Sequence, residues 1–330
     1  MSEATTRSGA AAAGGTGPRR PRTDRRGSRG ARLVTRVRSW LPSLLLVSPS
    51  ILLIGLFVYG MIGWNTRLAL SDQHRPIDDG SFVGLDNFIA LWGEARWPAA
   101  VNNAIVFTVV FVGGALLLGW LLGLLLDKGI RGEPVFRTLF LAPMAVSFIA
   151  TGVVWRWLMN PAPAERATGL NALFVHFNLD FLVNTWWTAP DFGMAAMALP
   201  AIWQLSGYVM ALFLAGFRGV PEELREAARV DGCSEWGVYR HVVMPQLRPV
   251  TLSAVIIIGH MSLKVFDLII AIAGQQIVAD VPAVYMWSTV FEVRDPAKGA
   301  TIASYLLIAV AVFVIPYLVW TMRKERSEGR

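Results

Sequence analysis

The sequence predicts an all-α integral membrane protein with six transmembrane helices. Only 16% of its 330 residues are charged, 54% are hydrophobic, and the mean hydropathy is +0.49. A soluble domain carries roughly 25% charged residues, so this composition favours a bilayer over a large buried core. A helix needs about 20 apolar residues to cross a hydrocarbon core of about 30 Å. Six stretches are long enough: 41–63, 104–126, 138–158, 193–217, 250–273 and 300–321.

The six stretches are predicted to be helices because they lack the alternation of barrel strands. The first is too long for a signal-peptide core and has no A-x-A site after it, so we expect it to remain as a permanent span. Of the loops between them, 64–103 contains FVGLDNFIALWG, which predicts a short surface helix. The loop 159–192 contains Trp186 and Trp187, residues that suit a membrane–water interface.

Positive charge predicts the orientation, because Lys and Arg concentrate in cytoplasmic loops. With six spans, one side of the membrane receives 22 of the 30 Lys and Arg residues, the other receives 7, and Lys264 lies within a span. The basic side holds segments 1–39, 127–137 and 218–249 and the C-terminal tail. Both termini and segment 218–249 are therefore predicted to be cytoplasmic. Topology accounts for the net charge of +7 without a nucleic-acid partner.

The composition also divides the chain. Residues 1–38 are rich in Gly, Ala, Arg and Ser and poor in large apolar residues, which predicts a disordered basic cytoplasmic tail. The predicted parts that follow are the first transmembrane helix with its extracytoplasmic loop (39–98), the main transmembrane domain (99–322) and a cytoplasmic C-terminus (323–330). Cys233 is the sole cysteine, so no intrachain disulfide can form.

Catalytic motifs are missing from the sequence. It has no G-x-x-x-x-G-K-[ST] phosphate loop, no H-E-x-x-H and no G-x-S-x-G. We therefore expect no catalytic residue, no metal site and no cofactor in this chain, and a membrane enzyme is a poor explanation of it.

A short charged segment separates the fourth and fifth apolar stretches. Residues 220–249 read VPEELREAARVDGCSEWGVYRHVVMPQLRP. Pro221 is predicted to begin a helix, since its missing N–H costs nothing in a first turn, and Gly232 is predicted to end it. A second short helix is predicted from Ser234 to Val243, before Pro245. The segment thus places a capped helix of roughly three turns at the cytoplasmic face.

The surface of this helix is predicted to be a narrow apolar stripe edged by charges. Leu224, Ala227 and Ala228 form the stripe, and its small residues let another backbone come close. Glu226 and Arg229 are three residues apart and can pair. A solvated linker is the alternative interpretation. Linkers rarely combine an alanine pair, defined caps and two prolines, so we favour a docking helix.

The residues of this segment resemble a known signature. Glu226-Ala227-Ala228, three residues, Gly232, nine residues and then VVMP, ending at Pro245, is similar to the EAA motif of permease subunits in bacterial ABC importers. Val and Met stand where that motif has Ile and Leu, and the spacing is intact. The resemblance covers most of residues 41–323. Stretches such as RGEPVFRTLFLAPMAVSFIATGVVWRWLMNP and SLKVFDLIIAIAG resemble the carbohydrate-uptake branch of maltose and glucose/mannose type, and its first permease of the pair.

The resemblance implies a type I ABC importer (MetI-like) permease fold in a bacterial plasma membrane. Segment 218–249 would be the coupling loop that docks into a separate ATPase subunit, which uses the ATP and Mg. Its coupling residues would be Glu226, Ala227, Ala228, Asp231, Gly232 and Pro245. The implied partners are a second permease in a heterodimer, an ATPase dimer, an extracytoplasmic solute-binding protein, a sugar and membrane lipid. The family usually has a Gly-Gly-Pro turn after its Phe-Asp pair, whereas this chain has GQQIVADVP, which leaves the outer gate and the sugar open.

Polar residues in the fourth and fifth stretches predict a substrate pathway. His260, Lys264 and Asp267 are spaced i, i+4 and i+7, which puts them on one face of a helix, from mid-bilayer to the outer surface. Charges inside a bilayer normally face a cavity or each other. Trp203, Gln204 and Tyr208 of the fourth stretch join the predicted pathway. The structural alternative is that Lys264 pairs with Asp267 to anchor the helix end, while His260 packs against another helix.

Three further questions stay open at this point. An ABC importer for another solute, such as a polyol or glycerol phosphate, fits the same motifs. An ion-coupled secondary transporter would need intramembrane carboxylates, and Asp267 is the one acidic residue well inside a predicted span. The pairs Gly299/Ala303 and Ala300/Ser304 predict close helix contact, either within the chain or across two permeases.

Overall fold

The computed structural model describes residues 46–77 and 80–328, and its contacts divide the chain into two units, Met1–Met61 and Ile62–Arg330. Apart from one isolated bridge between Ser71 and Phe82, the described residues form helices and loops. The predicted all-α fold is confirmed for this part of the chain. The predicted disordered tail, residues 1–38, lies outside the described residues.

The described part of the first unit is helical. It belongs to one apolar helix, Leu46–Ala69, which contains a π-helical turn at Gly55–Tyr59 and ends with α2 (Gly60–Ala69). Residues 46–61 are exposed to more than a third almost throughout, as expected for side chains that face lipid. This helix matches the predicted first span, 41–63, from residue 46 onward.

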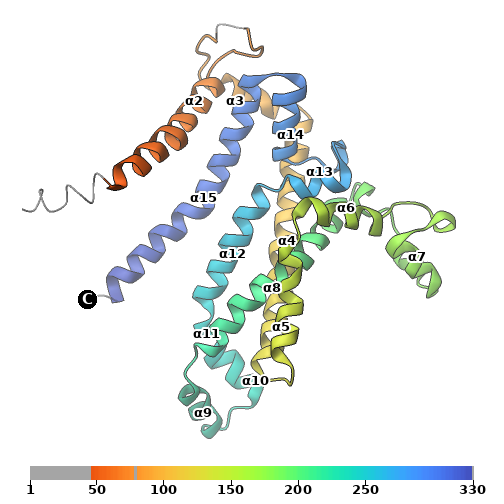
Figure 1. The fold of residues 1–330 in the computed structure, drawn as a ribbon, viewed down its shortest axis with the longest axis vertical. Helices are drawn as coiled ribbons and strands as arrows, with labels where there is room; N and C mark the ends of the chain where they lie inside the picture. Colours follow the sequence, from red (N-terminus) through yellow and green to blue (C-terminus); the bar gives the residue numbers. More distant parts are fainter. Residues whose placement is uncertain (1–45, 78–79, 329–330) are drawn as a thin grey trace, which may run out of the picture. The chain divides into compact units, whose positions relative to one another are not determined.

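Three predicted spans form unbroken helices in the second unit (Figure 1): α4 (Arg96–Asp127), α8 (Gly193–Arg218) and α15 (Pro296–Glu328). Within the described residues, these and the Leu46–Ala69 helix are the four helices long and apolar enough to span a membrane. The number rises to six if two bent pairs each count as one span. Those pairs are Glu133–Ala145 with Phe148–Leu158, bent by 97°, and Glu235–Gln246 with Arg248–Leu263, bent by 62°.

The prediction of a continuous helix over 138–158 is wrong. Helix α5 (Glu133–Leu141) passes through a short 3-10 turn, and α6 (Phe148–Leu158) leaves in a new direction. Pro143 supplies no backbone N–H to continue α5. The hydroxyl of Ser147 then accepts a hydrogen bond from the Ala150 amide (3.2 Å), so it caps α6 as a new helix.

The fifth predicted span, 250–273, is also broken. Helix α12 (Arg248–Leu263) stops before Lys264, and α13 (Asp267–Ala273) begins after a turn at Lys264 and two residues without regular structure. The two halves pack on different partners. The Ser262 hydroxyl donates to Thr108 of α4 (2.9 Å), which holds the end of α12. Helix α13 instead lies against α6, where a Cβ added at Gly152 would be 2.5 Å from the Ala271 Cβ.

Helices α4 and α8 pack closely against each other. A Cβ added at Gly119 of α4 would lie 2.6 Å from the Val209 Cβ of α8. One added at Gly123 would lie 3.1 Å from the Phe213 Cβ. Glycines on one helix thus admit bulky side chains of the other, and the two helices form a single packed pair.

The segments that connect the predicted spans contain α3 (Asp86–Trp92), α7 (Gly169–His176) and α14 (Pro282–Ser288). Helix α3 confirms the short surface helix predicted in the first loop. Trp186 and Trp187, predicted to lie at a membrane–water interface, have side chains that are buried in the protein. The Trp186 indole donates to Asn171 (2.8 Å), so its polar atom is satisfied without water.

The small residues of α15 make their contacts within the chain. A Cβ added at Gly299 would overlap Val290. The amide of Asn65 donates to the Ala300 carbonyl oxygen (3.1 Å) and to the Ser304 hydroxyl (3.0 Å). Of the two contacts left open by the sequence, the intrachain one is therefore present.

We expect Gly207→Ala to destabilise the protein. The Phe140 carbonyl oxygen of α5 occupies the place where a Cβ at Gly207 of α8 would project. Relieving such an overlap costs about 1–3 kcal/mol, which thermal unfolding in detergent would detect as a lower Tm. Gly113→Ala on α4 is the matched control, since a Cβ there meets no described atom within 4 Å. Equal Tm values for the two variants would contradict this packing.

Candidate functional site

Segment 218–249 folds into two capped helices, as predicted, although the second continues through Pro245 to Gln246 and does not end before that proline. Helix α9 (Glu222–Val230) ends at Gly232, whose φ of +86° is the left-handed conformation that favours glycine. The amide of Cys233 donates to the Ala228 carbonyl and that of Gly232 to the Arg229 carbonyl, both at 3.0 Å, which closes the helix end. The Ser234 hydroxyl accepts from the Gly237 amide (3.2 Å) and caps the second helix, Glu235–Gln246, which contains α10 (Glu235–Val238) and α11 (Met244–Gln246).

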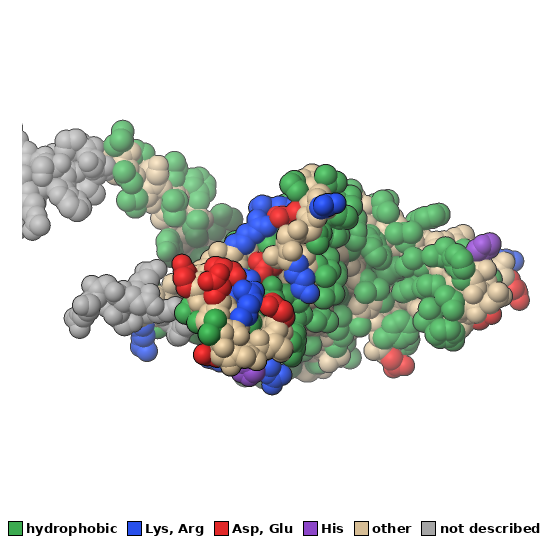
Figure 2. Space-filling view, turned by 90° about the horizontal axis from the view of Figure 1, so that it is seen from below, with side chains coloured by type: hydrophobic (Ala, Val, Ile, Leu, Met, Phe, Trp, Pro, Cys, Tyr) green, Lys and Arg blue, Asp and Glu red, His purple; other side chains and the backbone are tan. Residues whose placement is uncertain are grey.

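The exposed apolar stripe of α9 differs from the predicted one. Ala228 is buried against the chain, whereas Leu224 is 45% exposed, Ala227 is exposed and Val230 is 86% exposed. The stripe is therefore Leu224, Ala227 and Val230, spaced by three residues. Figure 2 shows this end of the molecule, where acidic and basic side chains gather amid hydrophobic flanks.

The predicted ion pair between Glu226 and Arg229 is wrong. The guanidinium of Arg229 binds Glu222 at 2.9 Å and Glu235 at 2.8 Å. Glu222 lies two turns earlier on the same face, and the turn at Gly232 brings Glu235 back toward α9, so Arg229 is already occupied. Among the described residues, the exposed carboxylate of Glu226 has no ion-pair partner.

A buried arginine fixes the inner face of α9. Arg225 Nη1 donates to Asp127 Oδ2 at the end of α4 (3.0 Å), and Nη2 donates to the Phe217 carbonyl near the end of α8 (2.6 Å). The Tyr239 hydroxyl donates to the same Asp127 oxygen (2.8 Å). Burial is the largest single influence on the pKa of Arg225 and would lower it. The hydrogen bond that Arg225 donates to Asp127, together with the nearby negative charges of Asp127 and Glu222, still raises that pKa overall, so the guanidinium stays charged. We call Arg225, Asp127 and Tyr239 the Arg225 bridge.

This bridge was not predicted from the sequence, although one signal was present. Asp127 is the last residue of a long apolar helix, where a negative charge opposes the helix dipole. A carboxylate in that place requires a cation. Arg225 lies on the side of α9 opposite the exposed stripe, the side that contacts the rest of the chain.

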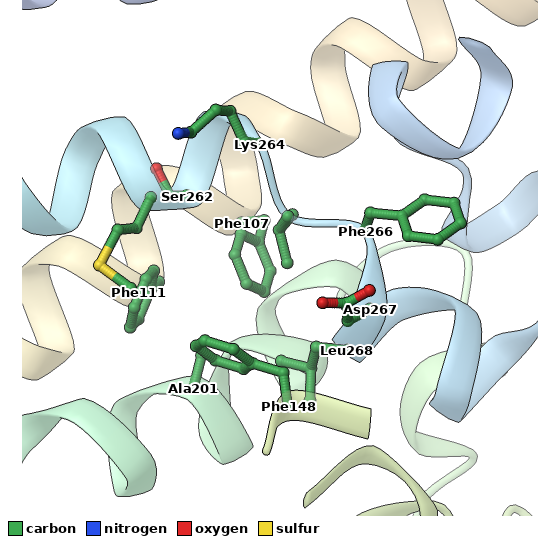
Figure 3. Close-up of a pocket in the computed structure, with 11 residues that line it drawn as sticks. Phe107, Phe111, Phe148, Ala201, Ser262, Lys264, Phe266, Asp267 and Leu268 are labelled. Carbon is green, nitrogen blue, oxygen red and sulfur yellow. The ribbon is translucent and has the colours of Figure 1, made fainter. Parts of the chain in front are cut away.

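The break between α12 and α13 opens a pocket of about 330 Å³. Four aromatic rings line it: Phe107 and Phe111 from α4, Phe148 from α6, and Phe266 from the break itself. Figure 3 shows the carboxylate of Asp267 pointing into this space, while the amine of Lys264 points away from it. Ser262, from the end of α12, adds a hydroxyl to the lining. No three His, Cys, Asp or Glu side chains of the described chain are grouped to hold a metal ion.

The single helical face predicted for His260, Lys264 and Asp267 is wrong, because α12 ends at Leu263. Lys264 and Asp267 both line the pocket, but from either side of the break. Neither has an ion-pair partner among the described residues, so the alternative of a Lys264–Asp267 anchor is not formed either. His260 Nδ1 lies 3.0 Å from the Ile257 carbonyl oxygen of its own helix and does not line this pocket.

The fourth-span candidates lie outside this pocket. Gln204 is 2% exposed, and its Nε2 donates to the Val146 carbonyl (2.6 Å). This bond gives a partner to a carbonyl at the bend between α5 and α6. Trp203 packs against Trp155, with ring centroids 6.1 Å apart, and Tyr208 packs against the hydrophobic core. The aromatic lining was not predicted, because the sequence does not distinguish a phenylalanine that faces lipid from one that faces a cavity. The cavity exists only because the fifth predicted span is broken.

Comparison with known proteins identifies the class. Residues 115–324 match the family "binding-protein-dependent transport system inner membrane component". The chain belongs to this family and is the permease component of an ABC importer, a multi-pass membrane protein.

Two relatives and one solved structure agree with this assignment. The chain is 38% identical over 284 residues to a probable ABC transporter permease of Pyrococcus horikoshii, covering 86% of this chain and 96% of that protein. It is 33% identical over 276 residues to a xylose/arabinose import permease of Haloferax volcanii, covering 82% and 85%. It shares its fold with a chain of a bacterial alginate ABC transporter, at a TM-score of 0.72 and 19% identity, covering 88% and 99%.

Proposed function

We propose that this chain carries a sugar across the membrane as one of two different permeases, driven by ATP hydrolysis in separate subunits. The observation that carries the proposal is α9, a rigidly capped helix that presents an apolar stripe in a chain without a phosphate-binding loop. The chain lacks a motif for binding ATP phosphates. An exposed helix that docks on an ATP-binding subunit would still let it respond to ATP.

In this proposal α9 and both termini face the cytoplasm, and α9 docks in a groove of the ATPase, which binds the ATP and Mg. Leu224, Ala227 and Val230 would enter the groove. The free carboxylate of Glu226 would meet a cation at its rim, and Asp231 lies exposed beside it. Gly232 and Pro245 would act through the chain itself, by ending α9 and helping to shape the helix that follows.

The solute would pass through the pocket at the α12–α13 break. Sugar hydroxyls can donate hydrogen bonds to a carboxylate such as that of Asp267. The C–H faces of a sugar can stack on aromatic rings such as those of Phe107 and Phe148. The similarity to a xylose/arabinose import permease supports a sugar as the solute. An extracytoplasmic binding protein would supply it, which agrees with the family's dependence on such proteins.

The test is purification of the complex through a tag on this chain, followed by uptake in proteoliposomes. We expect an ATPase and a second, different permease to co-purify. Uptake of at least one sugar from a panel of xylose, arabinose, glucose and maltose should require ATP, Mg²⁺ and the binding protein. A complex without an ATPase, or uptake driven by an ion gradient alone, would refute the proposal. Two copies of this chain and no other permease would refute the heterodimer.

A second candidate solute is a polyol phosphate such as glycerol phosphate. Lys264 favours it, because this residue lines the pocket and its amine, although it points away from the cavity, has no ion-pair partner among the described residues. Competition distinguishes the two, since excess sn-glycerol 3-phosphate would abolish sugar uptake only if the phosphate were the preferred solute.

A further inference from the structure

The Arg225 bridge joins three elements through one side chain. The guanidinium contacts the last residue of α4, Asp127, and the Phe217 carbonyl of α8, one residue before that helix ends. Tyr239 joins Asp127 from the helix that follows α9, and Arg225 lies 5.7 Å from the centre of its ring. The side chain of Arg225 is 10% exposed and that of Asp127 is 5% exposed, so water screens this contact poorly.

Both helices held by the bridge reach the pocket. Phe107 and Phe111 lie 20 and 16 residues before Asp127 on α4, and Ala201 lies 16 residues before Phe217 on α8. At 1.5 Å per residue, the bridge is about 25–30 Å from the pocket along the helix axes. Between the bridge and the pocket, α4 and α8 pack closely. Val209 fills the space beside Gly119, and Phe213 fills the space beside Gly123. A displacement at the cytoplasmic ends therefore moves the pair as one body.

We propose that Arg225 is a positioning residue that transmits movement of α9 to the α4–α8 pair and, through that pair, to the pocket. This inference rests on the proposed docking of α9 to an ATPase. Without the bridge, α9 would follow its partner while α4 and α8 did not, so ATP hydrolysis would continue without opening or closing the pocket.

Arg229 provides a matched control on the same helix. It is also an arginine in two ion pairs, but both partners, Glu222 and Glu235, belong to segment 218–249 itself. Removing Arg229 deletes the same charge and a similar number of contacts without cutting a link to α4 or α8.

The experiment follows the pocket directly and needs no knowledge of the solute. Cys233 is the sole cysteine, so Cys233→Ser gives a cysteine-free chain, and Met261→Cys places one thiol in the pocket lining. The complex is purified with its ATPase, and the rate of N-ethylmaleimide labelling is measured without nucleotide and after trapping with Mg-ATP and vanadate. ATPase co-purification and ATP hydrolysis are scored separately. Failure of the parental complex to retain an ATPase would count against the proposed function and is thereby distinguished from failure of the bridge.

With the bridge intact, we expect nucleotide trapping to change the labelling rate on the order of fivefold or more, the usual size of an allosteric coupling. Arg225→Met should retain the ATPase and its hydrolysis but lose this change, while Arg229→Met should keep it. Arg225→Lys, which retains the charge, should restore part of it. Because Arg225→Met leaves Asp127 buried without its cation, Arg225→Met/Asp127→Asn is measured as well and should behave alike. A full nucleotide response in that double variant, or loss of ATPase binding in it, would overturn the inference.

Discussion

Gly232→Val or Gly232→Trp is expected to abolish ATPase association and ATP-driven uptake while leaving the protein in the membrane. At a φ of +86°, an L-residue with a Cβ is strained by roughly 1–2 kcal/mol, and a β-branched residue by more. Relieving this strain would open the turn that sets α9 against the following helix. A Cβ at Gly232 meets no described atom within 4 Å, so a bulky side chain would also project outward, toward the proposed partner.

Two controls separate these effects. Gly232→Asn tolerates the left-handed conformation and should retain more association than Gly232→Val, although the two side chains are similar in size. Gly237→Ala, on the next helix, meets described neighbours only at ordinary contact distances of 3.4 Å or more and should behave like the parent. Co-purification and substrate-stimulated ATP turnover are the measurements. Normal turnover in Gly232→Trp would count decisively against α9 as the coupling helix.

Asp267→Asn is expected to lower sugar uptake by about tenfold or more, the cost of about one charge-assisted hydrogen bond. The carboxylate points into the pocket, and the amide that replaces it accepts hydrogen bonds less strongly. Lys264→Met should have a smaller effect on a neutral sugar, since the amine points away from Asp267. Uptake in proteoliposomes, with the amount of inserted protein as reference, measures both.

Asp180→Asn is the matched control, because this exposed carboxylate lies in the loop between α7 and α8, outside the pocket lining. Gln204→Ala should instead lower the Tm, as it removes the hydrogen bond that satisfies the bend at Val146. Wild-type uptake rate and sugar preference in both Asp267→Asn and Lys264→Met would show that the pocket is structural and not a solute pathway.

Much of the fold could be predicted because apolar length and turn chemistry are local properties. The runs that became α4, α8 and α15 are long and apolar, and the prolines inside α8 and α15 do not break them. The ends of α9 follow from Pro221 and Gly232, and the start of the next helix follows from Ser234. The breaks at Pro143 and before Asp267 could not be predicted with the same rules. A proline inside an apolar run does not reveal that the chain turns by 97°, and the stop at Leu263 depends on α12 and α13 packing against different helices.

The candidate site was partly predictable for the same reason. Lys264 and Asp267 are conspicuous as charges in an apolar run, and both do line the pocket. Gln204 is just as conspicuous, but its side chain donates a hydrogen bond to the Val146 carbonyl at the bend between α5 and α6, and this bend was not predicted from the sequence. Arg225 and Asp127 are 98 residues apart, and only the packing of α4 against α8 brings their charges together.

The packing of α4 and α8 also constrains how the protein is made. Helix α8 is the least apolar of the four unbroken spans and the one most buried by the rest of the chain. It is synthesised after α4, whose glycine-lined groove receives Val209 and Phe213. Lipid alone is a poor solvent for Gln204 and Ser206, so α8 enters the bilayer with α4 already there as its template. During biogenesis we therefore expect α8 to insert by packing against α4. Substitutions that fill the glycine-lined groove of α4 should then first be detected as failed membrane insertion of α8.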